Sequence, residues 1–285
     1  MRLRIASAAL LPALTLAVAM MLGGCKSEAQ RHFDQAVDHY DKKDWKDARA
    51  EFEQAVKLDP KMLDAHKALA QLDEFFGDEE GAGREYDAAS MLDPTDQKLT
   101  SKVRYYRLVK QMASQADDAM GDIKIGKFDE GLATLKDVMV QSKSKAVRQH
   151  ALATLGQAAP IIAQQGDDLA GQKKYADALK AYDAAIRAYM LITQATGQTS
   201  LDSAADKVLH SANQAAKLAG TPDVTFKMLN DVLGLDPDDK AANMELAQTY
   251  LSRDPPDYST AADLMERAGA PDAEVAKLRA KAKRH

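Results

Sequence analysis

Residues 48–60, ARAEFEQAVKLDP, recur 34 positions later as residues 82–94, AGREYDAASMLDP. Residues three and four apart lie on one face of a helix, so the small residues let a second helix approach while the aromatic ring fills the space between them. Proline is tolerated in the first turn of a helix but not inside one, so Leu-Asp-Pro marks a helix end. The matched positions are Ala48 and Ala82, Phe52 and Tyr86, Ala55 and Ala89, and Pro60 and Pro94.

The rest of the chain carries the same pattern more loosely. An aromatic residue followed three positions later by a small one predicts the start of the second helix of a pair. Leu235-Asp236-Pro237 repeats the stop signal. The aromatic openers and their small partners are Trp45 and Ala48, Phe128 and Gly131, Tyr175 and Ala178, and Tyr258 and Ala261, with Gly166, Tyr182 and Ala185 completing the pattern around Tyr175.

This pattern resembles the tetratricopeptide repeat, a helix–turn–helix unit of about 34 residues that stacks into a superhelix. The resemblance implies an all-α fold, a TPR-like α-solenoid of antiparallel helix pairs with a C-terminal capping helix. It also implies one repeat domain over 29–285, preceded by a tether at 25–28. About six repeats are expected, of which the first two match best and the central ones are degenerate. Their approximate bounds are 29–62, 63–96, 97–143, 144–199, 200–237 and 238–270.

Uneven spacing predicts unusual helices in the middle of the chain. The small anchors Ala82, Gly131 and Ala178 are 49 and 47 residues apart, so either the central helices are long or an extra helix is inserted. One helix is expected over 97–124, which contains no proline. We expect Pro160 to start a helix after Gly156 ends the previous one. A last helix over about 271–284 would cap the stack.

The N-terminus predicts export. Arg2 and Arg4 precede an apolar run at 5–22, which ends in Leu22-Gly23-Gly24-Cys25. Residues 1–24 thus read as a signal peptide, cleaved between Gly24 and Cys25. The ending resembles the bacterial lipobox, which implies acylation of Cys25, palmitate included, and stable attachment to a membrane. The alternative is a transmembrane anchor, because the run is about long enough to span a bilayer.

The residue after the cysteine bears on the choice of membrane. Bacterial lipoproteins of the enteric type retained at the inner membrane carry aspartate there, whereas this chain has Lys26. The resemblance therefore implies an outer-membrane protein, lipid-anchored and facing the periplasm, and leaves the inner membrane open. Cys25 is the single cysteine, which excludes an internal disulfide bond and a thiolate metal cluster.

Composition and motifs point away from catalysis. The formal net charge of −5 disfavours non-specific binding of nucleic acid. The six histidines form no zinc-binding pattern, and no nucleophile or nucleotide-binding motif is present. Adjacent acids such as Asp117 and Asp118 point in different directions on a helix. We therefore expect no catalytic residues, metal, cofactor or small-molecule substrate.

The resemblance implies that the first helix of each pair lines a concave surface that binds a protein partner. Phe33 and Tyr40 also have the spacing of a buried face; Tyr40 is expected in the core, and Phe33 fits either role equally. Phe33 and Val37 replace the polar residues with which chaperone-cofactor repeats bind a terminal carboxylate, so that clamp is expected to be absent. The expected surface includes Phe33, Val37, Lys67, Gln71, Phe75, Ser101 and Tyr105.

The favoured hypothesis is a membrane-anchored scaffold or assembly factor in the bacterial cell envelope. A sharper form is a pilotin-like factor for pilus or secretin assembly, and an alternative is an adaptor that regulates a cell-wall enzyme. An enzyme or small-ligand binder with a pocket between the central helices is the remaining hypothesis. The basic end at 277–285 either solubilises the last helix or contacts anionic envelope polymer or lipid.

Overall fold

The computed structural model describes residues 26–283. The predicted signal peptide, the cleavage and lipidation site at Gly24 and Cys25, and the last two residues lie outside this range. Between residues 26 and 283 the chain forms thirteen α-helices, one short 3-10 helix and no strand, which confirms the all-α prediction. None of the helices in this part of the chain is both long enough and apolar enough to cross a bilayer.

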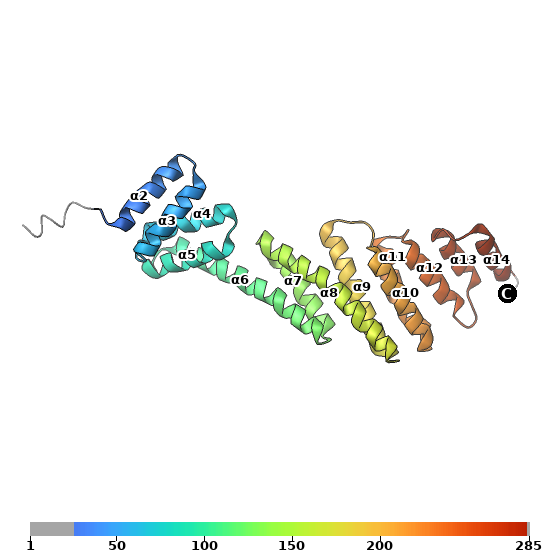
Figure 1. Cartoon of the computed structure of the whole chain (residues 1–285). Helices are drawn as coiled ribbons and strands as arrows, with labels where there is room; N and C mark the ends of the chain where they lie inside the picture. Colours follow the sequence, from blue (N-terminus) through green and yellow to red (C-terminus); the bar gives the residue numbers. More distant parts are fainter. Residues whose placement is uncertain (1–25, 284–285) are drawn as a thin grey trace, which may run out of the picture. The chain divides into compact units, whose positions relative to one another are not determined.

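The chain divides into two compact units, the first ending at Leu108 and the second beginning at Val109. The boundary falls inside one helix, and each unit is described by itself. The first unit contains two helix pairs and the start of the long helix (Figure 1). Its helices are α2 (Glu28–Asp41), α3 (Trp45–Leu58), α4 (Leu63–Phe76), α5 (Glu79–Leu92) and the first part of α6 (Gln97–Lys124).

The repeated residues form the core of the first unit. Phe52 and Tyr86, at equivalent positions, lie in two adjoining clusters of buried side chains, and their small neighbours on α3 and α5 are completely buried. The prolines at the two stop signals are exposed in the turns between pairs. The buried small neighbours are Ala48, Ala55, Ala82 and Ala89.

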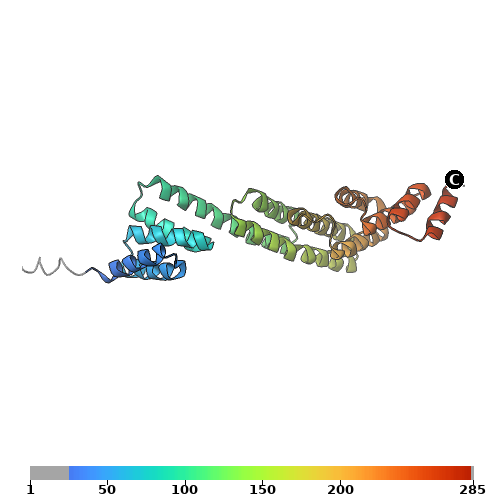
Figure 2. The same cartoon turned by 90° about the horizontal axis from the view of Figure 1, so that it is seen from above.

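The second unit continues the pairing of antiparallel helices. In Figures 1 and 2, α8 and α9 run side by side, and they pack against each other along their lengths. The final helix packs on the one before it, as predicted for a cap. After the end of α6, the elements are α7 (Phe128–Gln141), α8 (Lys145–Gly171), α9 (Tyr175–Thr196), α10 (Ser203–Leu218), η1 (Pro222–Thr225), α11 (Phe226–Leu235), α12 (Lys240–Leu251), α13 (Tyr258–Arg267) and α14 (Asp272–Ala282).

Each of the four aromatic openers is the first residue of a helix, because α3, α7, α9 and α13 begin at Trp45, Phe128, Tyr175 and Tyr258. Three of these helices follow a tight turn in which the residue two positions earlier has a left-handed backbone. That residue is Gly126 before Phe128, but it is a lysine before Trp45 and Tyr175, with φ of 66° at Lys43 and 61° at Lys173. Left-handed backbone is unfavourable for a residue with a side chain.

The central helices are long, which is one of the two alternatives that the spacing leaves open. α6 has 28 residues and covers 97–124 without a break, α8 has 27 and α9 has 22. The prediction of a helix start at Pro160 is wrong, because α8 runs from Lys145 through Gly156 and Pro160 to Gly171. Ala159 and Ile162, which flank the proline, are completely buried. Packing of this apolar face holds the helix together where local propensity alone would end it.

Small residues allow the closest helix contacts in the second unit. A Cβ atom built on Gly131 of α7 would lie 2.8 Å from the carbonyl oxygen of Ala119 and 2.6 Å from Cγ1 of Ile123, both on α6. A Cβ atom on Gly166 of α8 would lie 2.6 Å from the ring of Tyr182 on α9. Glycine is therefore required at both positions for the helices to lie as close as they do.

Candidate partner-binding surface

The predicted surface residues on α2 and α4 differ in accessibility. Phe33 is half-buried, and its ring meets the Phe52 ring edge-on with 5.5 Å between centroids. Phe33 therefore packs against the core, one of the two roles that the sequence left open. Val37 is 38% exposed, Gln71 is exposed, and Phe75 is 66% exposed.

Four aromatic side chains of the first unit form a group at the surface, here called the aromatic cluster, in which Trp45 is half-buried and the other three are exposed. The ring centroids of Tyr40 and Trp45 are 4.9 Å apart, those of Trp45 and Phe75 are 5.7 Å apart, and those of Phe75 and Phe76 are 5.4 Å apart. Tyr40 is 42% exposed and Phe76 41% exposed. The prediction that Tyr40 belongs to the core is therefore wrong, because its position at the end of α2 leaves the ring beyond the buried layer.

Local sequence explains why the cluster stays at the surface. Phe75 and Phe76 are the last two residues of α4, which ends at Gly77 with a left-handed backbone. Arg49 of α3 fixes this end of the helix, since its guanidinium donates to Asp73 at 2.6 Å and to Asp78 at 2.7 Å. The consecutive aromatics before a glycine were the sequence signal for the cluster, and the periodic pattern did not use it.

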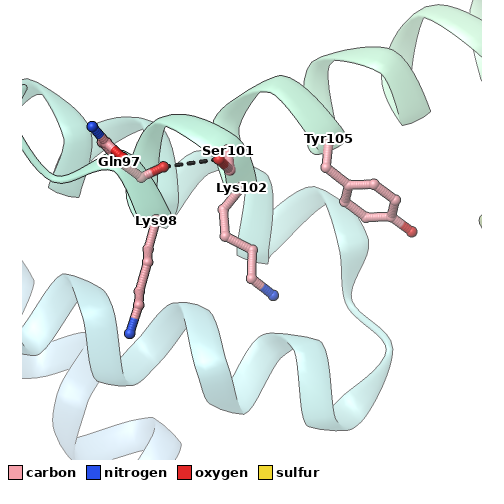
Figure 3. A pocket seen from close by; sticks show the side chains of 5 residues that line it. All are labelled: Gln97, Lys98, Ser101, Lys102 and Tyr105. Carbon is pink, nitrogen blue, oxygen red and sulfur yellow. Dashed lines mark hydrogen bonds between the residues drawn. The ribbon is translucent and has the colours of Figure 1, made fainter.

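A pocket of about 660 Å³ lies on the first turns of α6, beside α4 and α5. Figure 3 shows Lys98, Lys102 and Tyr105 pointing to one side of the helix, with Gln97 and Ser101 above them. The Ser101 hydroxyl donates to the Gln97 carbonyl at 2.8 Å, a bond within the helix. Tyr105 and Ser101 were expected on this surface, whereas the lysines were not.

Glu74 connects the pocket to the aromatic cluster. The side chain accepts hydrogen bonds from the Tyr86 hydroxyl at 2.9 Å and the Tyr106 hydroxyl at 2.7 Å, and it pairs with Lys102. Burial alone would raise the pKa of Glu74, but the three donors together hold it below its usual value. Phe75 is the next residue, so the pocket and the cluster adjoin along α4.

Lys67, another predicted surface residue, is already engaged within the fold. Its ammonium lies 3.1 Å from the Asp96 carboxylate, which caps the start of α6 through the backbone of Lys98 and Leu99. This pair fixes the turn between α5 and α6. Lys67 therefore has a role in joining the repeats, while Phe75, Val37 and Gln71 carry the accessible surface.

Two histidine–glutamate contacts in the first unit were not predicted from the sequence. His32 contacts Glu51 at 2.6 Å, and 34 residues later His66 contacts Glu85 at 2.6 Å. The hydrogen bond to Glu85 raises the pKa of His66, which lies buried between α4 and α5. The equal spacing of these residues was visible in the sequence and was the signal that could have found them.

The described residues 26–283 contain no group of three or more His, Cys, Asp or Glu side chains arranged to hold a metal ion. Of the predicted surface residues on α2 and α4, the exposed ones are Val37, Gln71 and Phe75, which present an apolar side chain, an amide and an aromatic ring.

Comparison with known proteins agrees with this description. The tetratricopeptide repeat family model matches residues 29–62. No curated protein matches the chain. Solved structures that match include the tetratricopeptide repeat domain of P58(IPK), with 16% identity, a TM-score of 0.31, and coverage of 95% of this chain and 68% of that one.

Two further structures match at similar levels. The TPR2AB domain of yeast Sti1, in complex with a pHSP90 peptide, has 15% identity, a TM-score of 0.35, and coverage of 90% and 99%. Pseudomonas aeruginosa pilF has 15% identity, a TM-score of 0.28, and coverage of 88% and 80%. Similarities this low carry no information about partners. Residues 29–62 therefore match a tetratricopeptide repeat, and the described residues 26–283 form an all-α fold of paired helices.

Proposed function

We propose that the protein is a non-enzymatic, membrane-anchored scaffold of the bacterial cell envelope that holds a protein partner on the first unit. The observation that supports the proposal is the aromatic cluster of Tyr40, Trp45, Phe75 and Phe76. The four rings touch in series, and three of them are exposed while Trp45 is half-buried. Contiguous exposed apolar surface on a soluble domain marks an interaction site, and aromatic side chains are enriched among residues that dominate binding energy.

The position of the cluster suits contact with a partner in the periplasm. The proposed anchor is acylated Cys25 in the outer membrane, three residues before α2 begins at Glu28. Tyr40 is twelve residues further along the same helix, or about 18 Å at 1.5 Å per residue. The cluster is therefore at the opposite end of α2 from the proposed anchor, where a neighbouring protein reaches it.

The pilotin-like factor and the adaptor of a cell-wall enzyme are two finer forms of this proposal. In the first, the partner is a secretin or pilus component, and in the second a hydrolase or synthase. Both use the same surface and need no catalysis by this chain. The protein that co-purifies with the chain distinguishes them.

Site-specific crosslinking tests the surface. A photo-reactive phenylalanine analogue at Phe75 is expected to capture a partner in cells, because the ring is 66% exposed within the cluster. The matched control is the same analogue at Met91 on α5, which is 74% exposed and outside the cluster. Equal capture at both positions, or capture at neither, would contradict the proposal.

The anchor is tested separately. Cys25→Ser is expected to remove the protein from the outer-membrane fraction, since the cysteine is the proposed site of acylation. Metabolic labelling with a fatty-acid analogue should label the wild type and leave Cys25→Ser unlabelled. A variant that stays with the outer membrane would show that attachment does not depend on this residue.

A further inference from the structure

The second unit contains a surface pocket whose charge is opposite to that of the chain as a whole. The pocket measures about 580 Å³ and lies where the end of α7, the start of α8 and the end of α9 meet. Figure 1 shows these three helices as neighbours, and all three pairs are in contact. The charged residues that line it are Lys136, Lys145 and Arg148, and no acidic residue does, although the chain carries a net charge of −5.

The three cations have no acidic partner within residues 26–283. Arg148 donates to the carbonyl of Ser142 at 2.7 Å, which holds the guanidinium beside the α7–α8 turn without neutralising it. Residues 138–166 contain no Asp or Glu, and neither do residues 184–201 at the end of α9. Asp137, next to Lys136 on α7, does not line the pocket. The lining itself is therefore positive, and an anionic group entering it gains charge-assisted hydrogen bonds.

The other side chains that line the pocket are apolar or carry an amide group. Leu152 and Leu191 form part of the floor, and Val140 at the edge is 75% exposed. Gln149 and Gln194 add two amide side chains. Each amide offers both a donor and an acceptor, which suits the N–H and C=O groups of a peptide backbone. A binding site that combines an apolar floor with a few polar groups takes a ligand that is itself amphipathic.

We propose that this pocket binds an acidic peptide segment of a partner protein, with an aliphatic side chain against Leu152 and Leu191 and carboxylates beside Lys136, Lys145 and Arg148. The charge complementarity selects an anionic occupant. The amides favour a peptide over a lipid headgroup, and the lining lacks the aromatic residues typical of membrane-interface contacts. The pocket belongs to the second unit, and the proposal does not rest on the function proposed for the first unit.

Selection from a display library of random peptides, about twelve residues long, tests the proposal on the full chain. The peptides enriched by the wild type are then measured by fluorescence anisotropy against two variants. Lys145→Glu reverses one charge of the pocket at the first residue of α8, where an acidic side chain is compatible with the helix dipole. Lys207→Glu is the matched control, since this exposed lysine on α10 has no ion-pair partner within residues 26–283.

The expected result is enrichment of peptides with Asp or Glu beside Leu, Ile or Val. Lys145→Glu should weaken their binding by about tenfold at low salt, while Lys207→Glu leaves it unchanged and added salt weakens it. Enrichment of neutral or basic peptides, no enrichment, or equal effects of the two variants would overturn the proposal. So would binding to vesicles of phosphatidylglycerol and phosphatidylcholine that Lys145→Glu abolishes while no peptide binds.

Discussion

Replacement of Gly131 by alanine tests how closely α6 and α7 pack. The added Cβ atom would lie 2.8 Å from the Ala119 carbonyl oxygen, which belongs to the backbone and moves only with the helix. Overpacking of this kind costs about 1–3 kcal/mol. Alanine also favours a helix over glycine by up to about 1 kcal/mol. We therefore expect Gly131→Ala to lower the free energy of unfolding by about 0–2 kcal/mol, the difference between these two effects.

The control removes the helix-propensity contribution. Gly121 is exposed on α6 with no atom within 4 Å of a built Cβ, so Gly121→Ala has the same gain without the clash. The two variants should differ by about 1–3 kcal/mol in urea unfolding followed by far-UV circular dichroism. Equal stabilities, or a Gly131→Ala protein more stable than Gly121→Ala, would refute the inferred packing.

Three further predictions concern single residues. Glu85 raises the pKa of His66 in the folded state. The stability that protonated His66 contributes is therefore present below the unfolded pKa and is lost as the pH rises through the folded pKa. The difference in unfolding free energy between the wild type and His66→Gln, measured in urea, should shrink from about pH 5.5 to pH 9. Arg49→Met leaves the buried Asp73 carboxylate unpaired and should lower the unfolding free energy by about 1–3 kcal/mol, which Asp73→Asn in the same background should partly restore. Pro160→Ala restores a backbone donor inside α8 and should raise the melting temperature, whereas no change would show that the helix is already relaxed around the proline.

The pairing of helices could be predicted from the sequence, because the residues that open a helix and those that end it act locally. An aromatic such as Trp45 opens a helix whose small neighbour Ala48 faces its partner, and the Leu-Asp-Pro stop follows one such helix at Pro60. These constraints repeat along the chain and are visible without tertiary information. The long helix over 97–124 was predictable for the same reason, since it lacks proline.

Tertiary contacts decided the rest. Pro160 lies inside α8 because the buried residues on both sides of it stabilise an unbroken helix. The spacing of residues in the sequence does not show how much free energy this packing contributes. Tyr40 has helical spacing suited to a core but projects past the end of the buried layer. The pocket around Lys145 and Arg148 draws on three helices, so no spacing along one of them could indicate it. The roles assigned to Cys25 and to the surface of the first unit stay predictions.

The left-handed lysines Lys43 and Lys173 have a practical consequence for anyone who wishes to produce this protein. A residue with a Cβ atom in this conformation is disfavoured by about 1–2 kcal/mol. Replacement by glycine removes this cost, although the larger entropy of glycine in the unfolded chain cancels part of the gain. Both side chains are exposed, and neither has an ion-pair partner within residues 26–283. Lys43→Gly and Lys173→Gly are therefore sensible first choices for a thermostabilised version for crystallisation, one in each unit and both distant in sequence from the proposed lipid attachment.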